Sequence, residues 1–195
     1  MRRYCRFQKG DDVRSIGLFS LLMVLILSGC NAQPAKPAAP APDYKPTFPI
    51  EEVMGHIIMP SADKLWGSVA TNVTAKGVEE IVPKTEDDWE MVRNYAVTLV
   101  EGTNLLLIPG RHVAEPGKKA ADASELSPEQ IEEKIKGDPA MWASHVAKLH
   151  DVAMESIAAI DKKSPEAMIE AGDHLDKACE DCHLVYWYPN EKNVQ

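Results

Sequence analysis

The chain has 195 residues, of which 45% are hydrophobic and 26% charged, a composition typical of a globular protein. Acidic residues outnumber basic ones by 30 to 21, which gives a formal net charge of −9 at pH 7. This acidic excess argues against nucleic acid as a partner, because binding to phosphate groups depends on clustered lysine and arginine side chains.

The N-terminus has the features of an export signal. Five basic residues in the first 14 positions precede a short apolar run, residues 16–27, which leads to Leu-Ser-Gly followed by Cys30. The run is shorter than the roughly 20 apolar residues that a membrane-spanning helix needs. It resembles the signal peptide of a bacterial lipoprotein, which is removed before a cysteine that then carries lipid. We expect removal of residues 1–29, lipidation of Cys30 and attachment on the periplasmic side of a membrane. Because Asn31 follows, we favour the outer membrane over the inner one.

A tether is expected to follow the lipidated cysteine. Residues 31–48 are rich in proline and alanine, which predicts an extended, semi-rigid segment. We therefore assign residues 30–48 to the tether and 49–195 to one folded domain. Removal of residues 1–29, with five basic and two acidic residues, leaves 16 basic and 28 acidic residues and a net charge of −12. Such a charge suits docking on a partner with a basic face.

Apolar residues of the folded domain recur every three or four positions, which predicts helices. The first helix is expected from Ile50 onwards, with Pro60 either kinking it or lying in the first turn of a restarted helix. Three further long helices are expected to begin at polar N-cap residues, Thr85, Asp138 and Ser164.

Two connections are longer than the others. No strand or hairpin signal is present, so residues 71–84 are expected to form a connection with at most a little extended structure. Residues 108–137 follow the second long helix, which Pro109 is expected to end, and they include a short helix that begins at Ser127. We predict an all-α fold, a four-helix bundle of up-down-up-down topology, with segment 108–137 crossing one end.

The sequence Cys179-Glu180-Asp181-Cys182-His183 near the C-terminus has the C-x-x-C-H pattern of covalent haem attachment. Two thiols at this spacing can bond to one haem, and the adjacent histidine is then held at the iron as an axial ligand. A redox dithiol is expected in a βαβ context, and a zinc site needs further ligands at short spacing. The sequence has no βαβ pattern before the motif and no further zinc ligands at short spacing. We therefore expect one haem c on Cys179 and Cys182, with His183 binding the iron.

Topology predicts the second axial ligand. In an up-down-up-down bundle the start of the first helix lies level with the end of the fourth, which places Met54 opposite His183. A thioether ligand favours a high reduction potential. Met59, further along the same helix, and Met141 and His145, at the start of the third, are weaker alternatives. The other histidines are expected to be surface or core residues.

A C-x-x-C-H motif close to the C-terminus of a predicted four-helix bundle makes residues 48–189 resemble the class II cytochromes c, the group of cytochrome c prime and cytochrome c-556. The resemblance implies attachment of haem at Cys179 and Cys182, with His183 as the proximal ligand. In the low-spin members a first-helix methionine is the sixth ligand, and Met54 takes that place.

Two residues depart from this family's pattern near the haem. Trp187 stands in the neighbourhood where members commonly have a basic residue, and Ile50 stands where an arginine is often found. Members often form homodimers through their first two helices, and a homodimer is an open alternative here.

The sequence therefore predicts a lipid-anchored monohaem cytochrome that transfers single electrons to or from a partner protein with a basic docking face. We expect no enzymatic activity, because no nucleophile constellation or phosphate-binding loop is present. The main alternative is a five-coordinate haem protein that binds or sequesters nitric oxide or carbon monoxide. A haem peroxidase is a weaker alternative, because no distal Arg-His pair can be placed.

Overall fold

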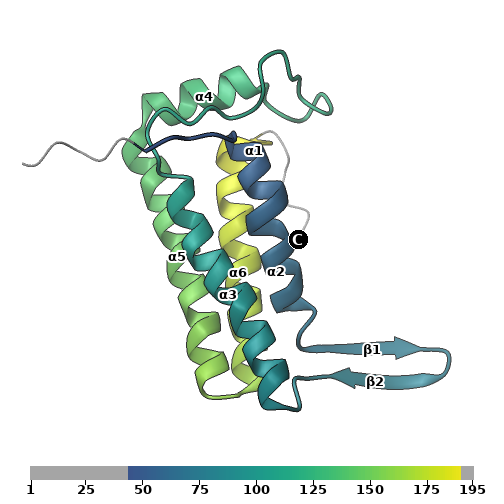
Figure 1. Ribbon diagram of the computed structural model, residues 1–195. Coiled ribbons are helices and arrows are strands. Elements are labelled where there is room, and N and C mark those ends of the chain that lie inside the picture. The colour runs from purple at the N-terminus through teal and green to yellow at the C-terminus, as the bar shows by residue number, and fades with distance from the viewer. Residues whose placement is uncertain (1–43, 190–195) are drawn as a thin grey trace, which may run out of the picture. The chain divides into compact units, whose positions relative to one another are not determined.

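The computed structural model describes residues 44–189, and these residues are mostly helical, as the sequence predicts (Figure 1). The helical segments are α1 (Ile50–Val53), η1 (Met54–Ile58), α2 (Met59–Trp66), α3 (Glu86–Leu105), α4 (Pro128–Gly137), α5 (Pro139–Asp161) and α6 (Pro165–Tyr186). Two strands, β1 (Ala70–Thr74) and β2 (Gly77–Ile81), form an antiparallel hairpin. Within this described part of the chain, no helix is long and apolar enough to cross a membrane.

The first helical run, α1–η1–α2, contains a π-helical turn next to Pro60. In a regular α-helix a proline ring collides with the carbonyl group four residues earlier, and the proline has no N–H to donate. In η1 the N–H of Met59 instead donates to the carbonyl of Met54, five residues back, which widens the helix at this point. Pro60 then lies in the first turn of α2, so the second of the two expected outcomes is confirmed.

The predicted helix starts are confirmed. The side chains of Thr85, Ser127, Asp138 and Ser164 each accept a hydrogen bond from the backbone N–H three residues further on. Thr85 and Ser127 each belong to a reciprocal capping box, in which the side chain of the third helical residue accepts a hydrogen bond from the N-cap N–H. α3 ends at Leu105, earlier than the proline that was expected to end it.

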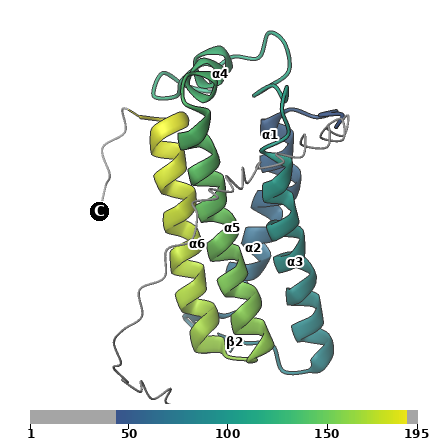
Figure 2. The ribbon, with the colours of Figure 1, turned by 90° about the vertical axis from the view of Figure 1, so that its left-hand side faces the viewer.

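The long helices share one apolar core. α2 contacts α3 and α6, and α5 contacts the same two helices, so that the four close a ring. Figure 2 shows them side by side. The apolar residues that recur every three or four positions in α3 and α5 are buried, including Leu99 and Ala153 at 0% exposure. Leu175 of α6 is equally buried. The hydrophobic periodicity therefore predicted this core correctly.

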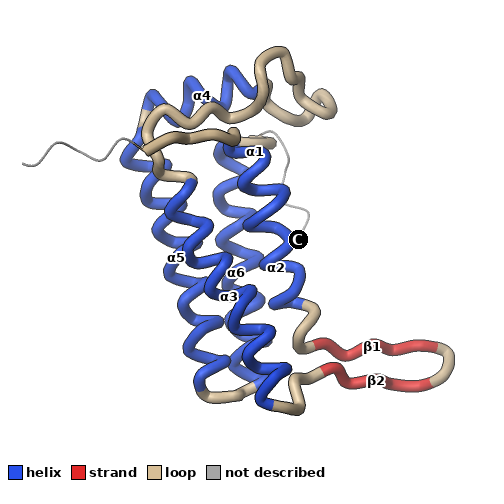
Figure 3. Tube along the Cα trace, viewed as in Figure 1, coloured by secondary structure: helices blue, strands red, loops and turns tan. Residues whose placement is uncertain are grey.

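The hairpin corrects the expectation that residues 71–84 contain no hairpin. Val73 of β1 pairs with Val78 of β2, and Gly77 closes the turn at φ 128°, a conformation that favours glycine. Every strand residue except Ala70 is exposed, and the hairpin projects away from the helices (Figure 3). No alternation of apolar and polar residues marks these strands in the sequence, because neither face of the hairpin is buried and only a buried face requires that alternation.

The segment between α3 and α5 crosses the end of the molecule at which α1 begins and α6 ends, as expected for residues 108–137 (Figure 1). Its helix α4 contacts both α5 and α6. The N–H groups of Ile50 and Glu51 donate to the carbonyls of His112 and Val113, each at 2.9 Å. These bonds pair two of the N–H groups that a helix leaves unpaired at its start, and they fix the segment to α1.

Candidate functional site

The C-x-x-C-H residues lie in the last two turns of α6. Cys179 and Cys182 are three positions apart, so their side chains share one face of the helix. Both thiols and the imidazole of His183 are half-buried and line the same pocket. The buried stripe of α6, which includes Ala178 and Tyr186, holds this face against the core.

That pocket, which we call pocket A, has a cavity volume of about 210 Å³. Besides the three α6 residues, Met54 of η1 lines it. The other lining residues are almost all apolar: Gly55, Ile58, Met59, Ala62, Leu106, Trp142, His145, Val146, Leu149 and Ala178. The structure thus brings the predicted first-helix methionine to the same cavity as the C-x-x-C-H motif.

A second pocket, pocket B, adjoins pocket A at the end of the molecule that α4 covers. It has a cavity volume of about 230 Å³ and shares Met54, Trp142, Cys182 and His183 with pocket A. Its remaining lining residues come from α1, the 106–127 connection, α4 and the end of α6: Ile50, Glu51, Glu125, Ile131, Ile135, Tyr186, Trp187 and Tyr188. His183 therefore lies where the two pockets meet.

The weaker candidate ligands are separated by their positions. Met59 and His145 also line pocket A, so the structure leaves both near the motif. Met141 lines neither pocket A nor pocket B and is 46% exposed. The imidazole of His145 also makes an edge contact with the ring of Tyr186, with the ring centroids 5.8 Å apart.

Burial affects the protonation of the two thiols and the imidazole of the motif. It raises the pKa of the Cys179 thiol to about 11 and that of Cys182 to about 12, so both remain thiols at neutral pH. Nucleophilic and redox-active cysteines have lowered pKa values, so this environment does not suit a reactive dithiol. Burial also lowers the pKa of His183, which favours the neutral imidazole, the form that binds metals.

The donor set fits an iron whose other ligands come from a cofactor. In the described residues, no three or more His, Cys, Asp or Glu side chains are grouped to hold a metal ion. Two thiols, one imidazole and a thioether in a largely apolar pocket match a covalently attached haem, because the porphyrin itself supplies the equatorial ligands. Cys179, Cys182 and His183 would hold that group, with Met54 available for the remaining axial position.

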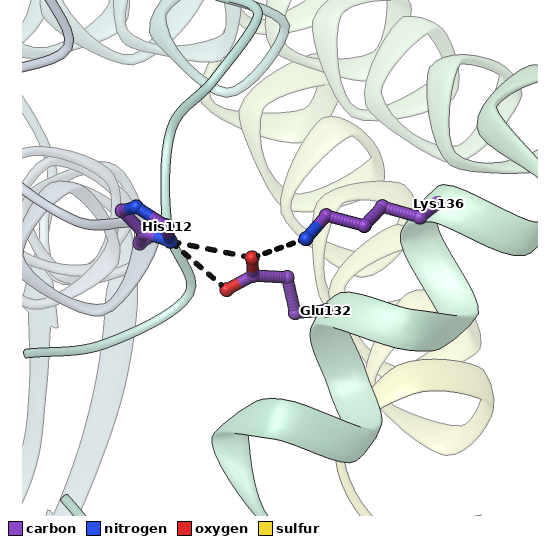
Figure 4. A network of polar contacts seen from close by, with 3 residues as sticks. All are labelled: His112, Glu132 and Lys136. Atoms are coloured by element: carbon purple, nitrogen blue, oxygen red, sulfur yellow. Dashed lines mark hydrogen bonds and ion pairs between the residues drawn. The ribbon is translucent and has the colours of Figure 1, made fainter. Parts of the chain in front are cut away.

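The helix α4 is held over this end by a polar network (Figure 4). The carboxylate of Glu132 accepts a hydrogen bond from Lys136 Nζ at 2.6 Å, and both its oxygens lie 3.2 Å from His112 Nδ1. The hydrogen bond from Lys136, followed by that from His112, holds the pKa of Glu132 below its ordinary value. Since Lys136 also belongs to α4, the contact with His112 is the one that ties the helix to the chain beside α1.

Two further contacts fix the same segment. Lys118 Nζ lies 2.7 Å from a carboxylate oxygen of Glu51 in α1, and the N–H of Leu126 donates to the carbonyl of Trp187 at 2.8 Å. Together with the α1 backbone bonds they hold α4 so that its side chains close pocket B.

The remaining histidines of the described segment behave as the sequence predicts. His56, His112 and His174 are exposed, His150 is half-buried, and each is placed to pair with a carboxylate: Glu52, Glu132, Glu155 and Asp151, respectively. None of them lines pocket A or pocket B.

Sequence reasoning did not find the contributions of Trp142 and α4 to the site. Trp142 lines both pockets, and Ile131 and Ile135 of α4 line pocket B. Trp142 looked like any other core residue of its helix. The apolar spacing of Ile131 and Ile135 was the one signal in the sequence that α4 has a face to bury.

No family model, curated protein or solved structure matches this chain. The resemblance to the class II cytochromes c therefore depends on the residues and their placement alone, and it stays a prediction. The expected signal peptide at 1–29 and the expected lipidation of Cys30 lie outside the described residues, and both also stay predictions.

Proposed function

We propose that this chain is a lipid-anchored, extracytoplasmic c-type cytochrome, similar to class II members, that transfers single electrons. The observation that carries this proposal is pocket A, where both thiols and the imidazole of the C-x-x-C-H motif meet Met54. The closed ring of contacts among α2, α3, α5 and α6 supports the further proposal that these helices form an up-down-up-down four-helix bundle. The lipid anchor and the periplasmic side depend on residues 1–30 of the sequence.

Each residue of the pocket has a role in this proposal. Cys179 and Cys182 would hold one haem covalently, and His183 and Met54 would be the protein ligands of its iron. The bound haem supplies an iron that gains and loses one electron. The thioether of Met54 favours the reduced state, and the apolar lining excludes water and so favours the less charged state of the centre.

The acidic surface supports a redox partner with a basic face. Glu170, Asp173, Asp176 and Glu180 are exposed on α6, the helix that carries the motif. Complementary charge speeds the encounter of two proteins and orients them. A partner that docks here would approach the helix to which the haem is bonded.

A second candidate function, binding of nitric oxide or carbon monoxide at a five-coordinate haem, is favoured by one observation. The lining of pocket A around Met54 is almost entirely apolar, and an uncharged diatomic molecule needs no polar partner there. The two candidates differ in one property, which is whether Met54 occupies the sixth position of the iron.

Absorption spectra test both proposals, on protein produced in a host that matures c-type haem. We expect the wild type to be low-spin in both redox states, with a methionine–iron charge-transfer band when oxidised, and to be unaffected by carbon monoxide. Met54→Ala should become high-spin and bind carbon monoxide. The control Met154→Ala, at an exposed position of α5, should match the wild type.

The alternative outcomes are distinct. A wild type that is high-spin and binds carbon monoxide would favour the gas-binding function. If Met54→Ala keeps the sixth ligand and the potential, Met59 and His145 become the candidates. A wild type without covalent haem would reject the cytochrome proposal altogether.

A further inference from the structure

Tyr186 carries a buried hydroxyl group without a hydrogen-bond partner. The residue is 4% exposed, and its Oη has no partner among the described residues. Buried polar groups of native proteins are nearly always hydrogen-bonded, because water is lost on burial and must be replaced. The hydroxyl of Tyr186 therefore indicates a partner that is not part of the described chain.

Aromatic contacts fix the position of this hydroxyl. The ring of Tyr186 packs edge-on against Trp142, with centroids 5.1 Å apart, and against His145 at 5.8 Å. Tyr186 lines pocket B together with Cys182 and His183. The phenol is thus held beside the residues that would bind the haem.

Two of the neighbouring donors are already engaged. Trp142 Nε1 donates to the carbonyl of Leu106 at 3.2 Å, and the Tyr188 hydroxyl donates to Glu180 at 2.8 Å. No lysine or arginine lines pocket A or pocket B. A carboxylate that entered pocket B would find Tyr186 as a donor but no cation among the lining residues.

The charged groups around Tyr186 are acidic. Glu51 and Glu125 line pocket B, and Asp138 at the start of α5 is close enough to affect the Tyr186 hydroxyl. Glu51 pairs with Lys118, and Glu125 accepts a hydrogen bond from the N–H of Ala121 at 2.8 Å. Like charges and burial both raise the pKa of a carboxyl group, whereas a hydrogen bond to its ionised form lowers it.

We propose that the Tyr186 hydroxyl donates a hydrogen bond to a carboxylate of the bound haem and stabilises its ionised form. This inference rests on the proposed function, since it requires covalent haem in pocket A. Tyr186 is then a positioning residue: it fixes one edge of the haem, and it sets the pH range over which the reduction potential changes.

The test compares Tyr186→Phe with wild type in the haem-loaded protein, by the midpoint potential as a function of pH. We expect the pH at which the potential begins to change to rise by about one unit, the size expected for loss of one hydrogen bond to an ionised group. The control is Tyr95→Phe, which removes a hydroxyl from a half-buried tyrosine of α3 that lines neither pocket A nor pocket B. It should leave the profile unchanged.

Failure of this inference can be told apart from failure of the proposed function. If Tyr186→Phe takes up haem normally and its pH profile matches the wild type, the inference is overturned and the cytochrome proposal stands. A wild type without covalent haem overturns the cytochrome proposal itself.

A second measurement needs no variant. In a crystal structure of the haem-loaded wild type, Tyr186 Oη should lie within about 3.2 Å of a haem carboxylate oxygen. A water molecule or a protein group in that place would overturn the inference.

Discussion

At the scale of single residues, Gly102 shows how closely α3 packs against the π-helical turn that carries Met54. A Cβ atom at Gly102 would lie 2.8 Å from Ile57 Cγ2 and 3.0 Å from Ile58 Cδ1, both in η1. These distances are shorter than van der Waals contact, so a side chain here requires the side chains of Ile57 and Ile58 to shift.

We expect Gly102→Ala to lower the free energy of unfolding by about 1–2 kcal/mol, because overpacking a core costs more than alanine gains in a helix. Urea unfolding followed by circular dichroism measures the change. The matched control is Gly137→Ala, where a Cβ would meet no atom within 4 Å. An unfolding midpoint of Gly102→Ala equal to that of the wild type would show that the side chains of Ile57 and Ile58 make room without cost.

The motif residues of the site could be predicted because their chemistry imposes a spacing in the sequence. Cys179, Cys182 and His183 are recognisable without a fold, and Met54 followed from the order of the helices. Two features could not be predicted: the buried Tyr186 hydroxyl without a hydrogen-bond partner, and the position of Trp142 in the lining of both pockets. An aromatic residue on a buried stripe has the same pattern whether it fills the core or faces a ligand, and only the three-dimensional contacts distinguish the two.

At the scale of elements, α4 depends on its contacts with the rest of the chain. It has ten residues, too few for a stable helix in isolation. Glu132 is its tie to His112, and the ionised carboxylate is the form that the folded protein favours, since its pKa is lowered. The stabilisation from Glu132 is thus present above the ordinary carboxyl pKa of 4.5 and is lost as the pH falls through the lowered value.

We expect Glu132→Gln to reduce the protection of α4 amides against hydrogen exchange by about two- to fivefold at pH 7, in line with a partly exposed ion pair. The difference from wild type should shrink as the pH falls through the lowered pKa of Glu132, where the wild-type carboxylate becomes neutral like the glutamine amide. Glu133→Gln, at the exposed neighbouring position, is the control. Equal loss of protection in both variants would mean that general charge, and not the contact with His112, holds α4.

Helix boundaries followed from local chemistry, whereas the hairpin and the π-helical turn did not. Thr85, Asp138 and Ser164 cap helices because their side chains accept hydrogen bonds from backbone N–H groups only three residues away, an interaction that does not depend on the rest of the fold. The β1–β2 hairpin buries neither face, and η1 departs from the period of 3.6 on which helix prediction depends. Met54, which the order of the helices placed opposite His183, is half-buried, whereas Ile50 and Val53 of the preceding turn are buried.

At the scale of the whole molecule, charge should govern the rate of electron exchange. The expected net charge of −12 for residues 30–195 attracts cations and repels anions over a distance that salt shortens. We expect the second-order rate constant with a tripositive inorganic oxidant to fall as ionic strength rises, and that with a trinegative oxidant to increase. Stopped-flow oxidation of the reduced protein measures both. Salt dependences of the same sign would contradict electrostatic steering by the protein surface.

The π-helical turn makes the length of the first helical run as important as its composition. It fits one more residue between Met54 and Met59 than a regular α-helix would hold. Loss of a single codon there would restore the regular helix without turning the residues before it, so Ile50 and Val53 would still face the interior. The cost would fall on Pro60, whose ring would then collide with the carbonyl four residues earlier. This stretch is therefore expected to tolerate the loss of one residue only if Pro60 is replaced as well.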